Sequence, residues 1–170
     1  MHYFEDLDAE VIVKRNDQLE LSYVEEFENI VLSPGPGIPE EAGLLKPIIS
    51  KYGATKRILG VCLGQQAIGE VFGGTLINLD QVYHGIATQI QITGEDYIFK
   101  GIPEEIEVGR YHSWVVNPDL PDSLEATSFD KNGQVMSLKH TTFDVRGVQF
   151  HPESILTPHG KQMLKNWLEK

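Results

Sequence analysis

The stretch Arg57-Ile58-Leu59-Gly60-Val61-Cys62-Leu63-Gly64-Gln65-Gln66 decides the fold class of this chain. Residues 57–61 are mostly apolar and have the length of a short buried strand. Leu63 to Phe72 then has the spacing of a helix, which Gly73-Gly74 ends. A buried strand that passes directly into a helix is the repeating unit of a parallel α/β sheet.

Short apolar runs on both sides of this stretch extend the pattern. Upstream we expect strands at Asp8–Arg15, around Val11-Ile12-Val13, and at Asn29–Leu32, then a helix over Glu40–Tyr52 that Pro47 kinks or divides. Thr88–Thr93 alternates apolar and polar residues, as a half-exposed strand does. Further strands are expected at 106–110, 114–116, 124–128, 134–139 and 145–150, and a closing helix at 159–169. We therefore predict one domain, residues 1–170, with an open, mostly parallel, doubly wound α/β sheet and a late antiparallel section.

Composition excludes several classes of function. The 170 residues carry 14 basic and 25 acidic side chains, a formal charge of −11, which disfavours nucleic acid and anionic membranes as partners. The single cysteine allows no internal disulfide and indicates a reducing compartment, the cytoplasm. No apolar run approaches the roughly 18 residues of a membrane span, and the first residues do not resemble a signal peptide.

Cys62 lies where the predicted strand meets the predicted helix, with Gly60 and Gly64 on either side. A nucleophile elbow needs this arrangement, because flanking glycines permit a tight turn that presents the side chain at the tip of the strand. The positive end of the following helix favours a thiolate. The alternative interpretation is a lone cysteine that serves as a small buried hydrophobic residue.

His151-Pro152-Glu153 supplies a proton carrier and a carboxylate two residues apart. Pro152 favours an extended conformation at His151, so the two side chains point the same way and Glu153 can orient the imidazole. This is the arrangement of nucleophile, base and orienting group in a catalytic triad. The alternative is a histidine at the end of a strand that happens to precede a turn; His112 is a reserve candidate for the base.

Ser33-Pro34-Gly35-Pro36-Gly37 follows a predicted strand and therefore reaches the same edge of the sheet as Cys62. Backbone N–H groups of its glycines, together with that of Leu63, could stabilise an oxyanion. The alternative is an ordinary Pro-Gly turn. No zinc or P-loop motif is present, so we expect neither a metal nor a cofactor.

These segments, with Gly60–Gln66 and Gln149-Phe150-His151-Pro152-Glu153-Ser154, resemble motifs of the class I (triad) glutamine amidotransferases over essentially the whole chain. The resemblance implies a flavodoxin-like sheet and a glutaminase in which Cys62 attacks the glutamine amide, His151 transfers protons and Glu153 orients His151. It also implies a glutamine and oxyanion pocket formed by Gly35, Pro36, Gly37, Leu63, Gln66, Ser113 and Trp114. At Trp114 the family often has leucine, so a contact through the main chain is expected there.

Arg110-Tyr111-His112-Ser113-Trp114 and His151–Pro158 are similar to the amidotransferase subunits of chorismate-using synthases. The resemblance implies a larger synthase subunit, component I, that receives ammonia and makes anthranilate or aminodeoxychorismate; we expect Gln81–Gly85 and the residues near Ser113 to face it. Two other hypotheses are a cysteine hydrolase without a partner and a non-catalytic regulatory subunit. Family members also have a buried strand and a loop before the segment matching His2–Leu7, so we expect a sheet that lacks this first strand and is poorly stable alone.

Overall fold

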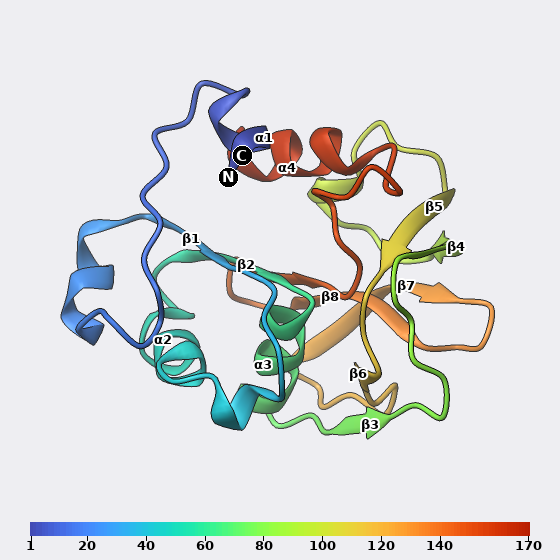
Figure 1. Ribbon diagram of the computed structural model, residues 1–170, viewed down its shortest axis with the longest axis horizontal. Helices are drawn as coiled ribbons and strands as arrows, with labels where there is room; N and C mark the ends of the chain where they lie inside the picture. The colour runs from blue at the N-terminus through green and yellow to red at the C-terminus, as the bar shows by residue number, and fades with distance from the viewer.

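A seven-stranded sheet forms the centre of the computed structural model, which describes residues 1–170 (Figure 1). The strand order is β1-β2-β9-β8-β7-β4-β5, and β3 and β6 form a separate pair. The strands are β1 (Asn29–Leu32), β2 (Arg57–Val61), β3 (Leu76–Asn78), β4 (Ile86–Ile92), β5 (Glu105–Arg110), β6 (Trp114–Val116), β7 (Leu124–Asp130), β8 (Val135–His140) and β9 (Val145–Val148).

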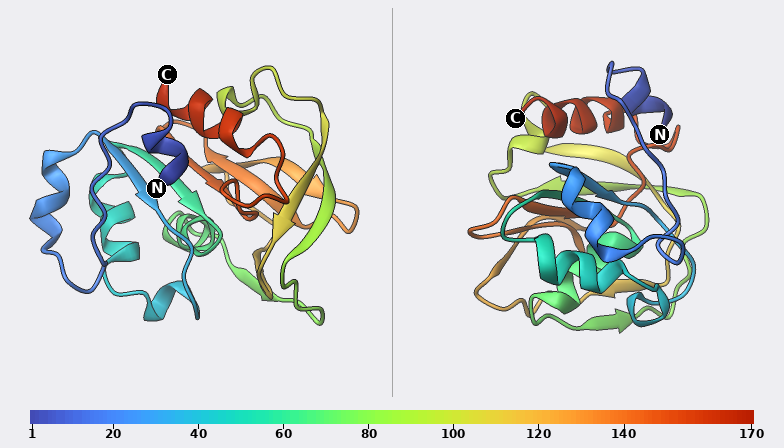
Figure 2. Two further views of the ribbon diagram at one scale, coloured as in Figure 1. Left: turned by 45° about the horizontal axis from the view of Figure 1, so that its top comes forward. Right: turned by 90° about the vertical axis from the view of Figure 1, so that its left-hand side faces the viewer.

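Helices cover both faces of this sheet. The α-helices are α1 (His2–Glu5), α2 (Leu45–Tyr52), α3 (Leu63–Val71) and α4 (Gly160–Leu168). Three short 3-10 helices are η1 (Leu21–Glu26), η2 (Pro39–Glu41) and η3 (Tyr97–Phe99). Figures 1 and 2 show α2 and α3 on one face and α1 beside α4 on the other.

The sheet divides into a parallel and an antiparallel part. Strands β1, β2 and β9 pair in parallel, and every other pair in the large sheet is antiparallel. The predicted α/β class and late antiparallel section are confirmed, although the antiparallel part contains more strand pairs than the parallel part. The register places Val61 opposite Val148, so the carboxyl ends of β2 and β9 lie side by side.

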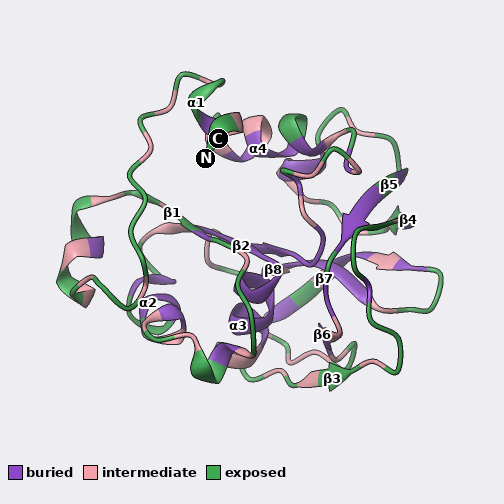
Figure 3. Ribbon diagram, in the orientation of Figure 1, coloured by how far each residue is buried: buried purple, intermediate pink, exposed green.

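Two hydrophobic cores hold the helices against the sheet. One lies under α2 and α3 and includes Ile49, Ile58 and Ile68, which are fully buried. The other lies under α4, where the rings of Phe4 and Trp167 pack edge to face with centroids 5.9 Å apart. Figure 3 shows that burial concentrates on the central strands and on most of α3, whereas α4 is buried only in part. The nearly continuous apolar sequence of β2 after Arg57 follows from this cover on both faces.

The strand expected at Asp8–Arg15 is not present, so this prediction is wrong. The segment runs as an extended strap from α1 to η1, and Ile12 and Val13 are 51% and 66% exposed. A strand needs a neighbour that satisfies its backbone N–H and C=O groups, and the strap forms no pairs with any strand. Strand β1 is accordingly an edge strand that pairs only with β2.

Two smaller differences concern the segments around α2 and β3. The helix expected over Glu40–Tyr52 is divided into η2 and α2, and Gly43, with φ 54°, lies at the break. Pro47 falls in the first turn of α2, where its missing N–H removes no helical hydrogen bond. The sequence does not predict strand β3, because three residues are too few to show a period.

Candidate active site

Cys62 occupies the turn between β2 and α3, as the sequence predicts. Its backbone has φ 53° and ψ −100°, a left-handed conformation that costs a non-glycine residue about 1–3 kcal/mol. A Cβ on Gly64 would lie 2.5 Å from the Leu32 carbonyl oxygen, and one on Gly60 would lie 2.5 Å from the Gly64 backbone. The tight turn therefore depends on both glycines and places the sulfur at the carboxyl end of the parallel strands.

Strand β9 brings the histidine motif to the cysteine. The Cys62 N–H donates to the Val148 carbonyl at 2.8 Å, which continues the pairing of β2 with β9 by one residue. The side chain of Gln149, the residue after β9, lies with Nε2 3.5 Å from Cys62 Sγ. The parallel register thus places the start of the His-Pro-Glu turn directly beside the sulfur.

Three contacts fix the turn that carries His151. Its N–H donates to the Gly109 carbonyl at 2.9 Å, and its own carbonyl accepts from Thr157 Oγ1 at 2.7 Å. Thr157 Oγ1 in turn accepts from the Gly109 N–H at 3.0 Å. At the far end of the turn a Cβ on Gly160 would lie 1.8 Å from the Pro152 carbonyl oxygen, so α4 begins in direct contact with the turn.

His151 and Glu153 form the pair that the sequence predicts, with His151 Nδ1 2.7 Å from Glu153 Oε1. Burial lowers the pKa of His151, but hydrogen bonding and charge at Cys62 and Glu153 raise it by more. The resulting pKa is about 9. Burial raises the pKa of Glu153, and the hydrogen bond with His151 outweighs this effect and lowers it overall. The other ring nitrogen, Nε2, is buried without a hydrogen-bond partner. The imidazole is therefore oriented by the carboxylate on one side and free to exchange a proton on the other.

The Ser33–Gly37 loop reaches the same place from β1. A Cβ on Gly35 would lie 3.0 Å from the Leu63 side chain, so the loop lies directly against the first residue of α3. Gly37 has φ 77°, in the left-handed region that favours glycine. Gly35, Pro36 and Gly37 are exposed. The structure thus brings the loop and the elbow together with an open side toward solvent.

Gln66, which lies in α3, contacts the main chain of Trp114. Gln66 Nε2 donates to the Trp114 carbonyl at 2.9 Å and to Gln149 Oε1 at 3.2 Å. The neighbouring Ser113 is half-buried, and its carbonyl accepts from the Leu79 N–H at 2.7 Å. At Trp114 it is the main-chain carbonyl, not the indole ring, that accepts from Gln66.

Sequence reasoning did not identify two side chains at this site. The Tyr111 ring lies 4.7 Å from the His151 ring, and Tyr111 Oη lies 3.3 Å from Ser154 Oγ. Gln149, which is fully buried, approaches the sulfur. The available signal for Gln149 was a polar residue at the end of an otherwise apolar strand; Tyr111 gave no signal beyond its place in a motif.

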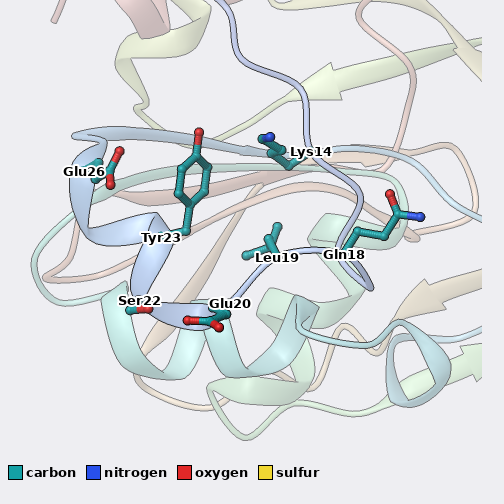
Figure 4. Close-up of a pocket in the computed structure, with 7 residues that line it drawn as sticks. All are labelled: Lys14, Gln18, Leu19, Glu20, Ser22, Tyr23 and Glu26. Carbon is teal, nitrogen blue, oxygen red and sulfur yellow. The ribbon is translucent and has the colours of Figure 1, made fainter.

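Two open hollows elsewhere on the surface contain none of the predicted site residues. One, of about 410 Å³, lies between the strap and η1, where Lys14 Nζ is 5.5 Å from the centre of the Tyr23 ring (Figure 4). The other, of about 570 Å³, is lined in part by Asp96 and Arg146. No group of three or more His, Cys, Asp or Glu side chains is arranged to hold a metal ion.

A model of the family described as glutamine amidotransferase class-I matches residues 1–170. The chain belongs to the class I glutamine amidotransferase family. The resemblance drawn from the sequence motifs is thereby confirmed. None of the chain's helices has the length and apolar content that a membrane-spanning helix needs.

Relatives of this amidotransferase carry the names of synthase subunits. It is 43% identical to aminodeoxychorismate synthase component 2 of Escherichia coli, over 99% of this chain and 91% of the relative. It is 42% identical to anthranilate synthase component 2 of Pseudomonas aeruginosa, over 100% of this chain and 88% of the relative. A Bacillus subtilis relative, 39% identical over 99% of this chain and 88% of its own length, is named for both products.

Solved structures show the same fold. A Thermoplasma acidophilum protein assigned as one subunit of a GMP synthase matches 99% of this amidotransferase and 84% of its own chain. The TM-score is 0.89 at 26% sequence identity. The order and packing of the elements are therefore those of class I amidotransferases, and the expected fold class is confirmed.

Proposed function

We propose that this chain is a glutaminase subunit that hydrolyses glutamine at Cys62 and supplies ammonia to a chorismate-using synthase. The observation that carries the proposal is that the strained cysteine elbow meets the His151–Glu153 pair. The Cys62 N–H donates to the carbonyl of Val148, three residues before His151, and His151 Nδ1 lies 2.7 Å from Glu153 Oε1. A nucleophile, a base and an orienting carboxylate at one point are the parts that acyl transfer needs.

The reaction proceeds through a thioester. Cys62 passes its thiol proton to His151, and its Sγ attacks the side-chain carbonyl carbon of glutamine, so that the carbonyl oxygen takes up negative charge. His151 gives a proton to the amide nitrogen, the C–N bond breaks and ammonia leaves. Water, which gives up a proton to His151, then attacks the γ-glutamyl thioester, so that glutamate leaves and the sulfur is restored. The overall balance is glutamine plus water to glutamate plus ammonia, with no oxidant or reductant.

The surrounding backbone and side chains bind the substrate in this proposal. The Leu63 N–H, at the first position of α3, and the Gly35 segment packed against it stabilise the oxyanion. Gln66, Ser113 and the Trp114 main chain contact the α-amino and α-carboxylate groups of glutamine. The exposed Pro36 and Gly37 line the open side of the pocket.

A partner that receives ammonia is supported by the relatives' names and by the surface near the triad. Ammonia released into neutral water is protonated and loses its nucleophilicity, so an enclosed transfer to a synthase is required. Ile155, two residues beyond Glu153, is 92% exposed, and Tyr111, which contacts His151, is 40% exposed. Exposed apolar side chains beside a catalytic pair are typical of a surface that a partner protein covers.

Glutamate release, measured with and without a candidate synthase and with Cys62→Ser as the control, tests the proposal. We expect release that the synthase stimulates and that Cys62→Ser abolishes. Turnover of unrelated amides without a synthase would instead support a partner-independent cysteine hydrolase. Absence of release even with the synthase would support a regulatory role.

The product of the complex has two candidates, because the relatives are named for aminodeoxychorismate, for anthranilate or for both. We propose the anthranilate-forming role, with the aminodeoxychorismate-forming role as the alternative or as a second use of the same chain. Assays that combine the chain with a synthase of each type distinguish these roles, since stimulated glutamate release should occur only with a synthase that it serves.

A further inference from the structure

A buried series of polar groups runs from Arg110 to the sulfur of Cys62. The Arg110 side chain is only 1% exposed and donates through Nη1 to Asp130 Oδ2 at 2.8 Å. Through Nε it donates to His112 Nε2 at 3.1 Å, and it stacks on the Tyr83 ring with Cζ 3.5 Å from the centroid. This cluster lies outside the triad and has no part in the reaction as written above.

Arg110 fixes the direction of the hydrogen bonds that His112 makes. A guanidinium has donors only, so His112 Nε2 must accept and its proton must sit on Nδ1. His112 Nδ1 therefore donates to the Trp114 carbonyl, 3.0 Å away. Burial, with a contribution from the Arg110 charge, lowers the pKa of His112 to about 3, so the ring remains neutral at working pH.

The Trp114 carbonyl has acceptors only, so the Gln66 atom that faces it at 2.9 Å must be the amide nitrogen. The same nitrogen lies 3.2 Å from the Gln149 amide, which must then present its oxygen. The Gln149 nitrogen is left facing Cys62 Sγ at 3.5 Å. The orientation that starts at the Trp114 carbonyl thus places a donor against the sulfur, and the partner that such a donor favours is an anion.

We propose that Gln149 is a further catalytic residue that donates a hydrogen bond to the Cys62 thiolate, and that Gln66 and the Trp114 carbonyl fix its orientation. This inference rests on the proposed role of Cys62 as the nucleophile. Gln149 adds a side-chain donor to the positive end of α3 and holds the sulfur in one position beside His151.

The test is the pH dependence of Cys62 alkylation by iodoacetamide, which needs neither glutamine nor a synthase. The variant is Gln149→Met, which has a similar volume but no donor. Gln65→Met is the matched control, because Gln65 is also fully buried but donates to the Val135 carbonyl at 3.3 Å, not to the sulfur. Unfolding measurements on both variants confirm that each is folded.

We expect Gln149→Met to move the pH midpoint of the alkylation rate upward by about one unit, from the loss of one hydrogen bond to a charged group. Gln65→Met should leave the midpoint at the wild-type value. An unchanged midpoint in folded Gln149→Met would overturn the inference, as would an equal shift in both variants. If Gln149→Met does not fold, Gln149→Glu is judged by the same measurement, and its acceptor-only carboxylate should move the midpoint upward further.

The outcome separates this inference from the proposed function. A shifted midpoint in Gln149→Met, together with no glutamate release by the wild type and its synthase, would refute the glutaminase and leave the hydrogen bond established. Synthase-stimulated release by the wild type, with no shift in Gln149→Met, would refute the role of Gln149 and leave the glutaminase intact.

Discussion

Cys62 combines a Cβ-bearing side chain with a left-handed backbone, and these two properties conflict. Replacement by alanine keeps the conflict, whereas replacement by glycine removes it at the cost of a more flexible unfolded chain. We expect Cys62→Gly to be more stable than Cys62→Ala by about 1 kcal/mol. Chemical denaturation of both variants measures the difference, and a less stable glycine variant would contradict the strain.

Cys62→Ser separates chemistry from folding at the same position. Serine keeps the backbone and nearly the volume of the site but has a far weaker nucleophile at neutral pH. We expect glutamate release to fall by at least about 10³-fold, with the midpoint of thermal unfolding close to that of the wild type. Retention of more than a tenth of the activity would show that another group is the nucleophile.

The raised pKa of His151 determines how this residue affects stability. Its value is about 9 in the folded chain, against 6.5 for an ordinary histidine, so folding favours the protonated ring. The resulting stabilisation is complete below about pH 6.5 and is lost as the pH rises through about 9. NMR titration should find the His151 pKa near 9 in the wild type and lower in Glu153→Gln; titration near 6.5 in the wild type would contradict the ion pair.

At the scale of elements, the contact between α3 and β1 depends on the absence of a side chain at Gly64. A Cβ there would lie 2.5 Å from the Leu32 carbonyl oxygen, and this backbone atom of β1 has little freedom to adjust. We expect Gly64→Ala to lower the free energy of unfolding by about 1–3 kcal/mol and to slow alkylation of Cys62. Denaturation and alkylation measure these effects.

Gly101→Ala provides the comparison for Gly64→Ala. Gly101 has φ 75° and open space around its Cα, so alanine introduces backbone strain without a clash. This control should lose stability while the alkylation of Cys62 keeps its wild-type rate. Equal alkylation rates in the two variants would show that packing at Gly64 does not govern the elbow.

The features that could be predicted are those that a contiguous stretch of sequence specifies. The elbow at Cys62 and the pair His151–Glu153 lie in contiguous motifs, where glycine and proline restrict the backbone. The strap at residues 8–15 could not be predicted, because a strand depends on a neighbour as well as on its own apolar residues. The orientation of Gln149 likewise depends on the Trp114 carbonyl, which only the folded chain brings near.

At the scale of the whole molecule, the exposed apolar side chains lie in separate places, and only some are near the triad. Ile155 is 92% exposed in the turn after Glu153, whereas Val13 is 66% exposed on the strap. We expect Ile155→Asp to weaken binding of the synthase by about 10-fold or more, the range of an interface side chain that costs over 1 kcal/mol. Val13→Asp is the matched control and should bind as the wild type does.

Titration calorimetry or a pull-down with the synthase measures this binding, and glutamate release measures its consequence. Ile155→Asp should lose the stimulation by the synthase while Cys62 keeps its wild-type rate of alkylation. Equal binding by Ile155→Asp and the wild type would place the synthase on another face of the molecule.

The close approach of Gly160 to the Pro152 carbonyl has a consequence for the chain's last helix. There is no space between the start of α4 and the turn that carries His151, so the helix cannot tilt or slide without moving that turn. The other side of α4 packs on α1, through Trp167 and Phe4. The position of His151, and with it the geometry of proton transfer, therefore depends on how α4 and α1 pack, although neither helix contains a reacting group.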